Sequence, residues 1–336
     1  MLLETEDFGE ILVINVARIG DTLLVTPALR ALKERFPFAN LTVLAHPKRK
    51  EVLQGIPFID HLRGITPKRA RWMGWLSGKR YDLALVYGKD LPLVRYALRI
   101  ARHVVVVGWK DLPPAKHLTV VPPLSRDMPL HAVDERMRLV EVVGAKPRQR
   151  RLAFWITDDE RRAAEEWLRA RGVENRHPVI GLQICSFPTK AHRDWPLESF
   201  RTLMASLAIE WPTSVFVILG DHLARTAAVP LTQAFQGRVL VAAGKTNLRQ
   251  AGALISQLDL YIGVDTGPTH IAGALDIPMI AMYHADYPGC NLAPLDRPGC
   301  IVLEHPLTGL VAPGVATMAD INVDSVLNAV RRLLLN

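Results

Sequence analysis

Polar residues whose chemistry suits an anionic ligand gather in residues 265–270 (DTGPTH), directly after an apolar run of strand length. Gly267 allows close approach of a ligand to the backbone, and the proline fits the first turn of a helix. Free N–H groups at a helix N-terminus bind anions, and the hydroxyls of Thr266 and Thr269 and the ring of His270 could add donors. An ordinary capped helix would explain Asp265 and the proline only. The segment therefore predicts a diphosphate site.

A second polar loop, residues 185–196 (CSFPTKAHRDWP), follows another apolar run. It combines the hydroxyl of Thr189 with the cations Lys190 and Arg193, either of which could neutralise a leaving diphosphate without a metal ion. A loop that serves solubility alone would not need the bulky pair Trp195-Pro196 at its exit. We therefore expect this loop to contact a diphosphate.

Asp21 lies in a third loop, residues 17–22 (ARIGDT), after the apolar run at residues 10–16. The loop lacks the GxGxxG spacing of a dinucleotide-binding turn. A carboxylate at this place either caps a short turn or acts as a general base facing an interdomain cleft. Both interpretations of Asp21 stay open at this point.

Local signals mark where the helices that position these loops begin. The pair Thr26-Pro27 is typical of an N-cap and a first turn, and predicts a helix to about Arg35. Thr157 precedes an acidic first turn, and Gly172 follows the basic end of the same segment. We therefore expect N-caps at Thr26 and Thr157.

Strand-like runs alternate with these helical segments along the whole chain, which indicates βαβ units and parallel sheets. The runs include residues 81–87 and 279–283, and a single helix is expected near residues 224–235. We predict an α/β protein with two Rossmann-like, doubly wound domains facing an interdomain cleft. The expected domains are residues 1–172 and 173–336, with the last helix packing on either of them. Ligands of such sheets bind at the carboxyl ends of the strands, which is where the three polar loops lie.

The chain of 336 residues carries a net charge of +8, and the excess is uneven. Residues 1–150 hold 25 basic and 15 acidic residues, whereas the remainder holds 16 and 18. The ordinary composition, the three cysteines and the lack of any apolar run of about 18 residues argue against disordered, disulfide-rich and membrane-spanning proteins. Because the start of the chain is acidic and unlike a signal peptide, we expect a soluble, cytosolic protein.

Residues 66–81 (TPKRARWMGWLSGKRY) concentrate the basic excess, since they interleave Lys68, Arg69 and Arg71 with two tryptophans. Two glycines disfavour a regular helix, so we predict a mobile loop. Such a loop could hold anionic groups of a large acceptor or rest its indole rings at a lipid headgroup layer.

Arg95, Arg99 and Arg102 follow at the spacing i, i+4, i+7. This spacing predicts the solvent-facing stripe of an amphipathic helix.

Taken together, the three polar loops are similar to those of glycosyltransferase family 9, the bacterial ADP-heptose:lipopolysaccharide heptosyltransferases, which have a GT-B fold. The likeness runs through ILVINVARIGDTLLVTPALRALKERFP, GLQICSFPTKAHRDWPLESF and GVDTGPTHIAGALDIPMIAMY, and includes the helix HAVDERMRLVEVVG. The order of a GD loop and a later DTGxTH segment is the most specific part of this resemblance.

The resemblance implies that Asp21 deprotonates an acceptor hydroxyl, which then attacks the anomeric carbon of a nucleotide sugar with inversion. Thr189 and Arg193 match positions that contact the phosphates of the donor, with Lys190 beside them, and Asp265 matches a position at the donor sugar. No metal and no cofactor are implied. The remaining assignments are Thr266, Gly267 and His270 for the diphosphate cradle, Thr246 for the pocket of the base, and Arg18, Lys68, Arg69 and Arg71 for the anionic acceptor.

The same resemblance implies ADP-heptose as the donor and the inner core of lipopolysaccharide, of the lipid A–Kdo type, as the acceptor. It places the enzyme at the cytoplasmic face of the inner membrane, with contact to the membrane surface and none to nucleic acid. Residues 15–18 (NVAR) and 86–90 (VYGKD) depart from the family pattern on the acceptor side, so the resemblance specifies the donor more closely than the acceptor.

Two alternatives stay open. The first is a family 9 enzyme that uses another nucleotide sugar or an acceptor other than lipopolysaccharide. The second, from a different class, is a basic nucleic-acid-binding or regulatory Rossmann-like module, although no nucleic-acid motif accompanies the basic loop.

Overall fold

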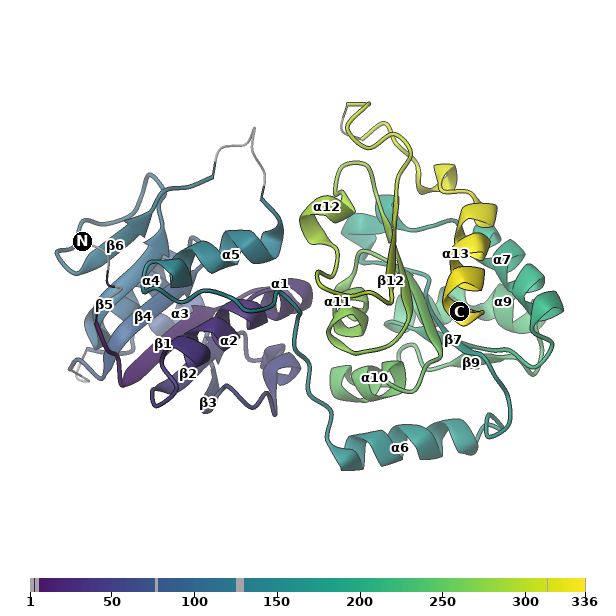
Figure 1. Ribbon diagram of the computed structural model, residues 1–336, viewed down its shortest axis with the longest axis horizontal. Coiled ribbons are helices and arrows are strands. Elements are labelled where there is room, and N and C mark those ends of the chain that lie inside the picture. Colours follow the sequence, from purple (N-terminus) through teal and green to yellow (C-terminus); the bar gives the residue numbers. More distant parts are fainter. Residues whose placement is uncertain (1–2, 4–5, 76–77, 125–129, 313, 336) are drawn as a thin grey trace. The chain divides into compact units, whose positions relative to one another are not determined.

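The computed structural model describes residues 3, 6–75, 78–124, 130–312 and 314–335. The chain forms two compact units, Met1–Trp155 and Ile156–Asn336, each built on one six-stranded parallel sheet (Figure 1). Parallel strands need crossover connections, and in both units helices supply most of them. The predicted α/β class with two doubly wound domains is therefore confirmed.

The sheet of the first unit has the strand order β3-β2-β1-β4-β5-β6, so the winding reverses between the neighbouring strands β1 and β4. Side chains on both faces of β1 are buried: Ile11 and Val13 on one face, Leu12 and Ile14 on the other. Such apolar runs are typical of parallel strands covered by helices on both sides. The strands are β1 (Glu10–Asn15), β2 (Asn40–Ala45), β3 (His61–Gly64), β4 (Tyr81–Tyr87), β5 (Ala101–Val107) and β6 (Leu118–Val121). The helices are α1 (Ile19–Leu23), α2 (Thr26–Arg35), η2 (Lys50–Leu53), α3 (Pro67–Ala70), α4 (Leu91–Ile100) and α5 (Ala132–Glu141).

The sheet of the second unit has the order β12-β11-β10-β7-β8-β9, which is the same topology with its reversal between β7 and β10. The strands are β7 (Val179–Gln183), β8 (Val215–Leu219), β9 (Val239–Val241), β10 (Leu260–Val264), β11 (Met279–Tyr283) and β12 (Cys300–Glu304). The helices are α6 (Asp158–Arg169), η3 (Pro188–Arg193), α7 (Leu197–Glu210), α8 (His222–Ala227), α9 (Val229–Ala234), α10 (Leu248–Ile255), α11 (Gly267–Ala274), α12 (Gly289–Leu292), η4 (Met318–Asp320) and α13 (Val323–Leu334).

The division between the units falls after Trp155, earlier than the expected boundary at residues 172 and 173. Helix α6 causes the difference, because it packs against α10 of the second unit. Arg249 of α10 donates from Nε and Nη2 to the two carboxylate oxygens of Glu160, at 2.8 and 2.6 Å. The last helix, α13, packs on α7 within the second unit.

Two N-caps were predicted, and the structure confirms one of them. The Thr157 side chain accepts from the backbone N–H of Glu160, while the Glu160 side chain accepts from that of Thr157, which completes a capping box. Thr26 is not an N-cap, because α2 is preceded by Val25 and the Thr26 hydroxyl donates to the carbonyl of Leu23. Thr26 is fully buried and its hydroxyl accepts from the N–H of Ala153, so it ties two segments together instead.

The basic segment after β3 is more ordered than the expected mobile loop. Thr66 caps the short helix α3, and Arg99 of α4 donates to the carbonyls of Met73 and Ala70 at 2.9 and 2.6 Å. The guanidinium of Arg99 also stacks on the ring of Trp75 at 4.8 Å. The predicted solvent-facing stripe is therefore wrong at Arg99, and also at Arg102, which lies in β5 beyond the helix. Residues 76 and 77 of the segment lie outside the described residues.

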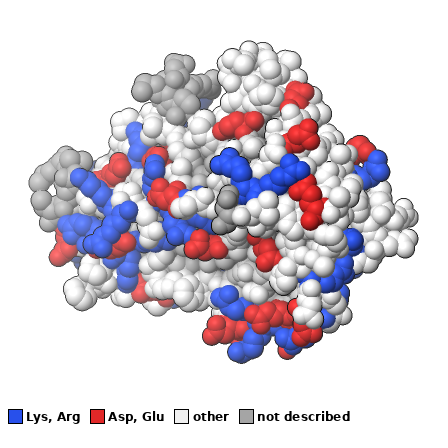
Figure 2. Space-filling view, turned by 45° about the vertical axis from the view of Figure 1, so that its right-hand side comes forward, with Lys and Arg blue, Asp and Glu red and all other residues white. Residues whose placement is uncertain are grey.

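Charged side chains of both signs are mixed over the surface seen in Figure 2. Acidic and basic residues gather along the lower edge, over α6, where the sequence DDERRAAEEWLR alternates the two signs. Among the helices that the structure describes, none is both long and apolar enough to cross a bilayer.

Candidate active site

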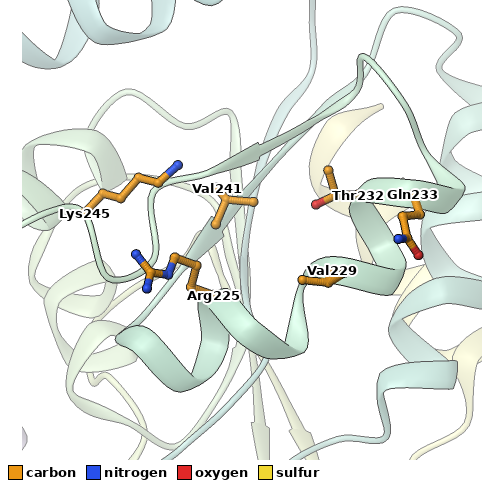
Figure 3. A pocket seen from close by; sticks show the side chains of 6 residues that line it. All are labelled: Arg225, Val229, Thr232, Gln233, Val241 and Lys245. Carbon is orange, nitrogen blue, oxygen red and sulfur yellow. The ribbon is translucent and has the colours of Figure 1, made fainter.

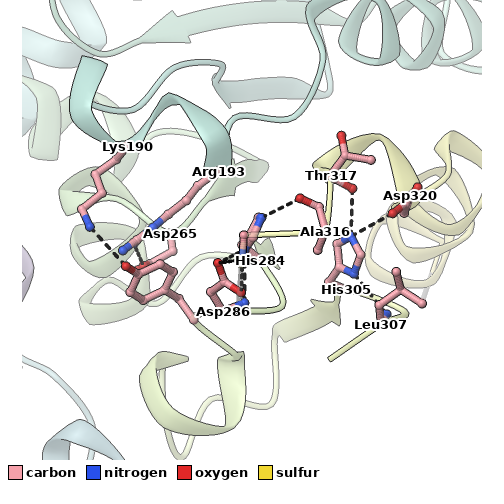
Figure 4. A network of polar contacts seen from close by, with 12 residues as sticks. Lys190, Arg193, Asp265, His284, Asp286, His305, Leu307, Ala316, Thr317 and Asp320 are labelled. Carbon is pink, nitrogen blue, oxygen red and sulfur yellow. Dashed lines mark hydrogen bonds and ion pairs between the residues drawn. The ribbon is translucent and has the colours of Figure 1, made fainter. Parts of the chain in front are cut away.

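The two predicted diphosphate loops meet at the carboxyl ends of β7 and β10, where the winding of the second sheet reverses. The loop after β7 contains η3, and β10 is followed directly by Asp265 and α11. Arg193, at the end of η3, donates from Nη1 to Oδ2 of Asp265 at 2.6 Å (Figure 4). The two side chains are only 11% and 8% exposed. The fold thus joins two residues that the sequence assigned separately to one ligand.

Asp265 also faces His270, whose Nε2 lies 3.3 Å from Oδ1. Burial by itself raises the pKa of the Asp265 carboxyl, but the hydrogen bond from His270 and the charges of His270, Arg193 and Lys190 outweigh burial and lower that pKa. The carboxylate is held by these side chains and does not cap α11, so the capped-helix alternative is wrong for Asp265.

Two buried nitrogens of this cluster lack a hydrogen-bond partner among the described residues: Nε of Arg193 and Nδ1 of His270. An unsatisfied polar atom in a buried position costs about 1–3 kcal/mol. Both atoms belong to residues that contact Asp265, and a bound ligand would relieve this cost. Arg193, Asp265 and His270 thus form one buried polar cluster.

Tyr287 contacts both cations of the η3 loop, Lys190 and Arg193. The sequence did not predict these contacts. Lys190 donates from Nζ to the Tyr287 hydroxyl at 3.3 Å, and the guanidinium carbon of Arg193 lies 3.5 Å from the centre of the Tyr287 ring. Hydrogen bonds from Arg193 and Lys190 lower the pKa of the Tyr287 phenol. The ring keeps the two cations on one side of the site, and no motif around Tyr287 could have shown this.

Helix α11 carries the predicted cradle at its N-terminus. Thr266 is its N-cap residue, yet its side chain makes no capping hydrogen bond, and Gly267 is the first helical residue. Thr269 was expected to offer a hydroxyl to the ligand, but it is 1% exposed and donates to the carbonyl of Val264. The expectation for Thr269 is therefore wrong, whereas Thr266 keeps its place at the open end of the helix.

Arg297 holds the other end of α11. Its guanidinium is almost completely buried and donates to the carbonyl of Gly273 at 2.8 Å and to that of Ile277 at 2.8 Å. A cation at a helix C-terminus satisfies free carbonyls and complements the helix dipole. Arg297 was missed because it lies beyond β11, far along the chain from the helix that it caps.

Two histidines fasten the segment that follows β12 to the same edge of the sheet (Figure 4). His284, directly after β11, donates to the carbonyl of Ala316 at 3.2 Å, and His305, directly after β12, donates to that of Thr317 at 2.8 Å. Both rings are nearly inaccessible to solvent. The ring of His284 also meets that of His192 in η3 edge to face at 5.4 Å, which connects this segment with the η3 loop.

The remaining predicted residues of the second unit are more dispersed. Thr189 is exposed on η3, and Trp195 closes the loop as predicted, since it is buried and donates to the carbonyl of Ile321 at 2.8 Å. Thr246 lies after β9, which β8 separates from β7, and its hydroxyl donates to the carbonyl of Ala242. Its assignment to the pocket of the base stays a prediction.

A shallow hollow of about 250 Å³ lies elsewhere in the second unit, between β9 and helices α8 and α9 (Figure 3). None of the predicted site residues lines it. Its lining consists of Arg225, Val229, Thr232, Gln233, Val241 and Lys245. Without a carboxylate or an unsatisfied buried group in this lining, the hollow offers less chemistry than the cluster around Asp265.

In the first unit, Asp21 lies in α1, directly beyond the carboxyl end of β1. Its Oδ1 accepts from Nη2 of Arg136 in α5 at 2.7 Å, and its side chain is 47% exposed. Arg136 is fixed in turn, because it donates to the carbonyl of Ala132 and its own carbonyl accepts from the Tyr87 hydroxyl. Asp21 caps no helix, since α1 begins after Arg18 without a side-chain cap. An oriented, accessible carboxylate suits a general base better than a turn cap.

The predicted acceptor residues Arg18, Lys68, Arg69 and Arg71 are all exposed. None of them forms an ion pair with another of the described residues. Arg49 was missed by the sequence analysis although it touches the loop of Asp21, donating from Nη1 to the carbonyl of Ala17 at 3.1 Å. The signal that could have revealed it is the basic run at residues 48–50, directly after β2.

Comparison with known proteins identifies the family of the chain. The sequence model described as glycosyltransferase family 9 (heptosyltransferase) matches residues 69–304, well over half of the chain. The chain belongs to glycosyltransferase family 9. The lipopolysaccharide core heptosyltransferase OpsX of Haemophilus influenzae is similar to this family 9 protein, with 24% identity over 293 residues that cover 84% of this chain and 81% of OpsX.

Solved structures of family 9 proteins share the fold. The glycosyl transferase family 9 protein of Veillonella parvula superimposes with a TM-score of 0.82 at 22% identity, covering 100% of this chain and 99% of that one. The E. coli heptosyltransferase WaaC, solved with ADP, gives a TM-score of 0.70 at 15% identity, covering 96% and 99%. The predicted GT-B fold is confirmed, and membership of family 9 makes this protein a glycosyltransferase.

Proposed function

We propose that this family 9 protein transfers heptose from ADP-heptose to the inner core of lipopolysaccharide, on an acceptor of the lipid A–Kdo type. The observation that carries the proposal is the cluster of Arg193, Asp265 and His270, with Lys190 beside it, at the carboxyl ends of β7 and β10. A nucleotide sugar presents a diphosphate next to a polyhydroxylated ring, and the cluster matches it with cations next to a carboxylate.

The cations would act on the leaving group. Cleavage of the bond between the anomeric carbon and the diphosphate leaves an additional negative charge on ADP, and fixed cations stabilise that charge in the transition state. Lys190 and Arg193 are held on one loop by Tyr287, so little reorganisation would be needed as the charge develops. With these cations in place, the proposed reaction requires no metal ion.

The carboxylate of Asp265 would accept hydrogen bonds from hydroxyls of the donor sugar. Its lowered pKa keeps it in the accepting form. The ADP bound in the structure of the similar protein WaaC supports a nucleoside diphosphate as the ligand of this family.

Asp21 would serve as the general base. Deprotonation of the acceptor hydroxyl makes it a nucleophile, and attack on the face opposite the diphosphate inverts the anomeric configuration. A positioned base contributes roughly a hundredfold to ten-thousandfold to the rate. The ion pair with Arg136 would aim one oxygen of the Asp21 carboxylate and leave the other for the proton.

The acceptor would be held by the exposed cations of the first unit. An inner-core acceptor is anionic and anchored in lipid, which fits the uncompensated side chains Arg18, Lys68, Arg69 and Arg71. Trp72 and Trp75, which are 80% and 70% exposed, would rest at the headgroup layer on the cytoplasmic face of the membrane.

A panel of ADP-, UDP- and GDP-sugars tests this proposal, with release of the free nucleotide as the readout in the presence of EDTA. We expect turnover with ADP-heptose and at most slow turnover with the other sugars. Preferred turnover of a UDP- or GDP-sugar would overturn the proposed donor. Loss of turnover on addition of EDTA would overturn the metal-independent reaction.

A further inference from the structure

A short basic turn follows β2 at the carboxyl edge of the first sheet, and the proposed function does not yet use it. We define the β2 basic turn as Lys48, Arg49 and Lys50. The N–H groups of Arg49 and Lys50 both donate to the carbonyl of His46 at 2.9 Å, and the N–H of Lys48 donates to Nδ1 of the His46 ring at 3.2 Å. These bonds fold the backbone tightly and leave the side chains of Lys48 and Lys50 exposed.

The β2 basic turn is attached to the loop of the proposed base. Arg49 points inward and donates from Nη1 to the carbonyl of Ala17, four residues before Asp21, at 3.1 Å. Helix η2, which begins at Lys50, also packs against α1, the helix that contains Asp21. An anion held by Lys48 and Lys50 would therefore lie on the same edge as the reacting hydroxyl.

The turn also adjoins the proposed acceptor residues after β3. Strands β2 and β3 are neighbours, and a Cβ added to Gly64, the last residue of β3, would lie 3.2 Å from Cα of Pro47. Only two residues separate Gly64 from α3, which carries Lys68 and Arg69. The cations that follow β2 and those that follow β3 thus belong to one continuous surface.

The cations of this surface lack ion-pair partners in the part of the chain that the structure describes. Neither Lys48 nor Lys50 forms an ion pair there, nor do Lys68 and Arg69. Like charges gathered without partners repel one another, and a bound polyanion would remove this repulsion. Two separate pairs of cations on adjacent strand ends suit a ligand with two separate anionic groups.

We propose that Lys48 and Lys50 form a second anion subsite for the acceptor, which binds a phosphate group of the lipid-linked sugar, while Arg49 positions the loop of Asp21. This inference rests on the proposed function for the nature of the acceptor. It assigns the β2 basic turn to a phosphate other than the group held by Lys68 and Arg69.

Equilibrium binding and turnover, measured side by side, test the subsite. The wild-type protein and its Lys48→Ala/Lys50→Ala variant are titrated with Kdo-bearing lipid A in detergent micelles, with its phosphates and after their removal. The variant Lys146→Ala/Arg148→Ala is the matched control, because it removes the same charge where Arg148 approaches Glu34, in the last turn of α2.

We expect the Lys48/Lys50 variant to bind the phosphorylated acceptor about tenfold more weakly, the order expected for two partly screened contacts. Its KM for the donor and its kcat should stay unchanged, and the control variant should bind the acceptor like the wild type. Added salt should reduce the difference in acceptor affinity between the Lys48/Lys50 variant and the wild type. Equal binding by variant and wild type would overturn the subsite. A loss that persists on the dephosphorylated acceptor would overturn the assignment to phosphate and indicate the Kdo carboxylate.

The two proposals fail in different ways. If the wild type binds the phosphorylated acceptor through Lys48 and Lys50 but releases no ADP from ADP-heptose, the proposed function fails and the anion subsite stands. If ADP-heptose is turned over while binding of the phosphorylated acceptor does not depend on these lysines, only the proposed subsite is wrong.

Discussion

Arg193 and Asp265 are 72 residues apart in the sequence, and their side chains meet at 2.6 Å with about nine-tenths of each buried. One comes from the end of η3, in the loop after β7, and the other directly follows β10, so the pair exists only because these strands are neighbours at the reversal of the sheet. Charges in such a position need partners, since desolvation of an unpaired ion costs several kcal/mol. The order of the strands therefore brings these two charged side chains together in the proposed donor site.

Removal of the Arg193 charge should weaken donor use strongly. For Arg193→Met we expect a fall in kcat/KM of about a hundredfold to a thousandfold, the scale found when one preorganised group at a developing charge is lost. Steady-state kinetics with varied ADP-heptose measures this. The conservative Arg193→Lys should recover part of the rate, because a cation is restored without the two-pronged geometry of guanidinium.

A loss of folding could imitate the Arg193 effect, because Asp265 would be left buried without its main cation. The double variant Arg193→Met/Asp265→Asn removes both charges and is the control for stability. Its thermal midpoint should lie above that of Arg193→Met alone. If Arg193→Met kept the wild-type kcat/KM, the donor site would not lie at this pair.

Asp21→Asn should separate chemistry from binding. The substitution keeps the size of the side chain and removes the proton acceptor, so kcat should fall about a hundredfold to ten-thousandfold. Affinity for ADP, measured by calorimetry, should stay within twofold of the wild type, because the proposed donor residues belong to the other unit. Near-normal turnover by Asp21→Asn would contradict the assignment of the base.

Arg136 should act on the same step through Asp21. In Arg136→Met the carboxylate loses the partner at 2.7 Å that orients it, so we expect a lower kcat with an unchanged KM for the donor. The double variant Asp21→Asn/Arg136→Met should be no slower than Asp21→Asn alone, because Arg136 acts through Asp21. A further fall in kcat in the double variant would mean that Arg136 acts by a route other than Asp21.

Replacement of Lys68, Arg69 and Arg71 by alanine should affect the acceptor alone. We expect the KM for a Kdo-bearing lipid A to rise about tenfold or more, with a weaker dependence on salt than in the wild type. The KM for ADP-heptose serves as the internal control and should not change. An equal loss for both substrates would show that these residues support the fold of the unit and not the acceptor.

Glu160 should make the second unit sensitive to acid. Hydrogen bonds from Arg249 lower the pKa of Glu160 to about 2 from a usual value of 4.5. Because the folded-state pKa is the lower one, this stabilisation is complete above pH 4.5 and is lost as the pH falls toward 2. Its size is about 2–3 kcal/mol of unfolding free energy for a side chain that is 26% exposed.

Glu160→Gln isolates this effect, because glutamine preserves the capping box with Thr157 but removes the charge that faces Arg249. Urea unfolding at several pH values should show a smaller loss of stability between pH 5 and pH 3 in the variant than in the wild type. Parallel losses in the two proteins would place the acid sensitivity elsewhere.

Local sequence patterns predicted much of this structure. The capping box at Thr157, the proline in the first turn of α11 and the apolar runs of β4 and β11 are local patterns, and each element appears where it was expected. The expected single helix near residues 224–235 is instead α8 and α9. The second proline-marked turn, at Pro230, explains this break, because proline favours the start of a new helix.

Local patterns could not predict the contacts between segments that are distant in the sequence. Arg136 and Tyr287 each look like an ordinary surface residue until the sheet order brings them to Asp21 and Arg193. The strands β3, β6 and β12 were not expected; they lie at the edges of their sheets and are only partly buried, so their sequences carry a weaker apolar signal than those of the central strands. Thr26 shows the reverse case, in which a good N-cap residue is used for a buried tertiary bond.

The most direct test of the central claim is the anomeric configuration of the product. The wild-type protein is incubated with ADP-heptose and Kdo-bearing lipid A in EDTA, and NMR of the isolated product determines the new linkage. The account predicts one heptose per acceptor, joined with inverted configuration, and no product from Asp21→Asn on the same timescale. A retained configuration, or a product formed equally well without the Asp21 carboxylate, would contradict it.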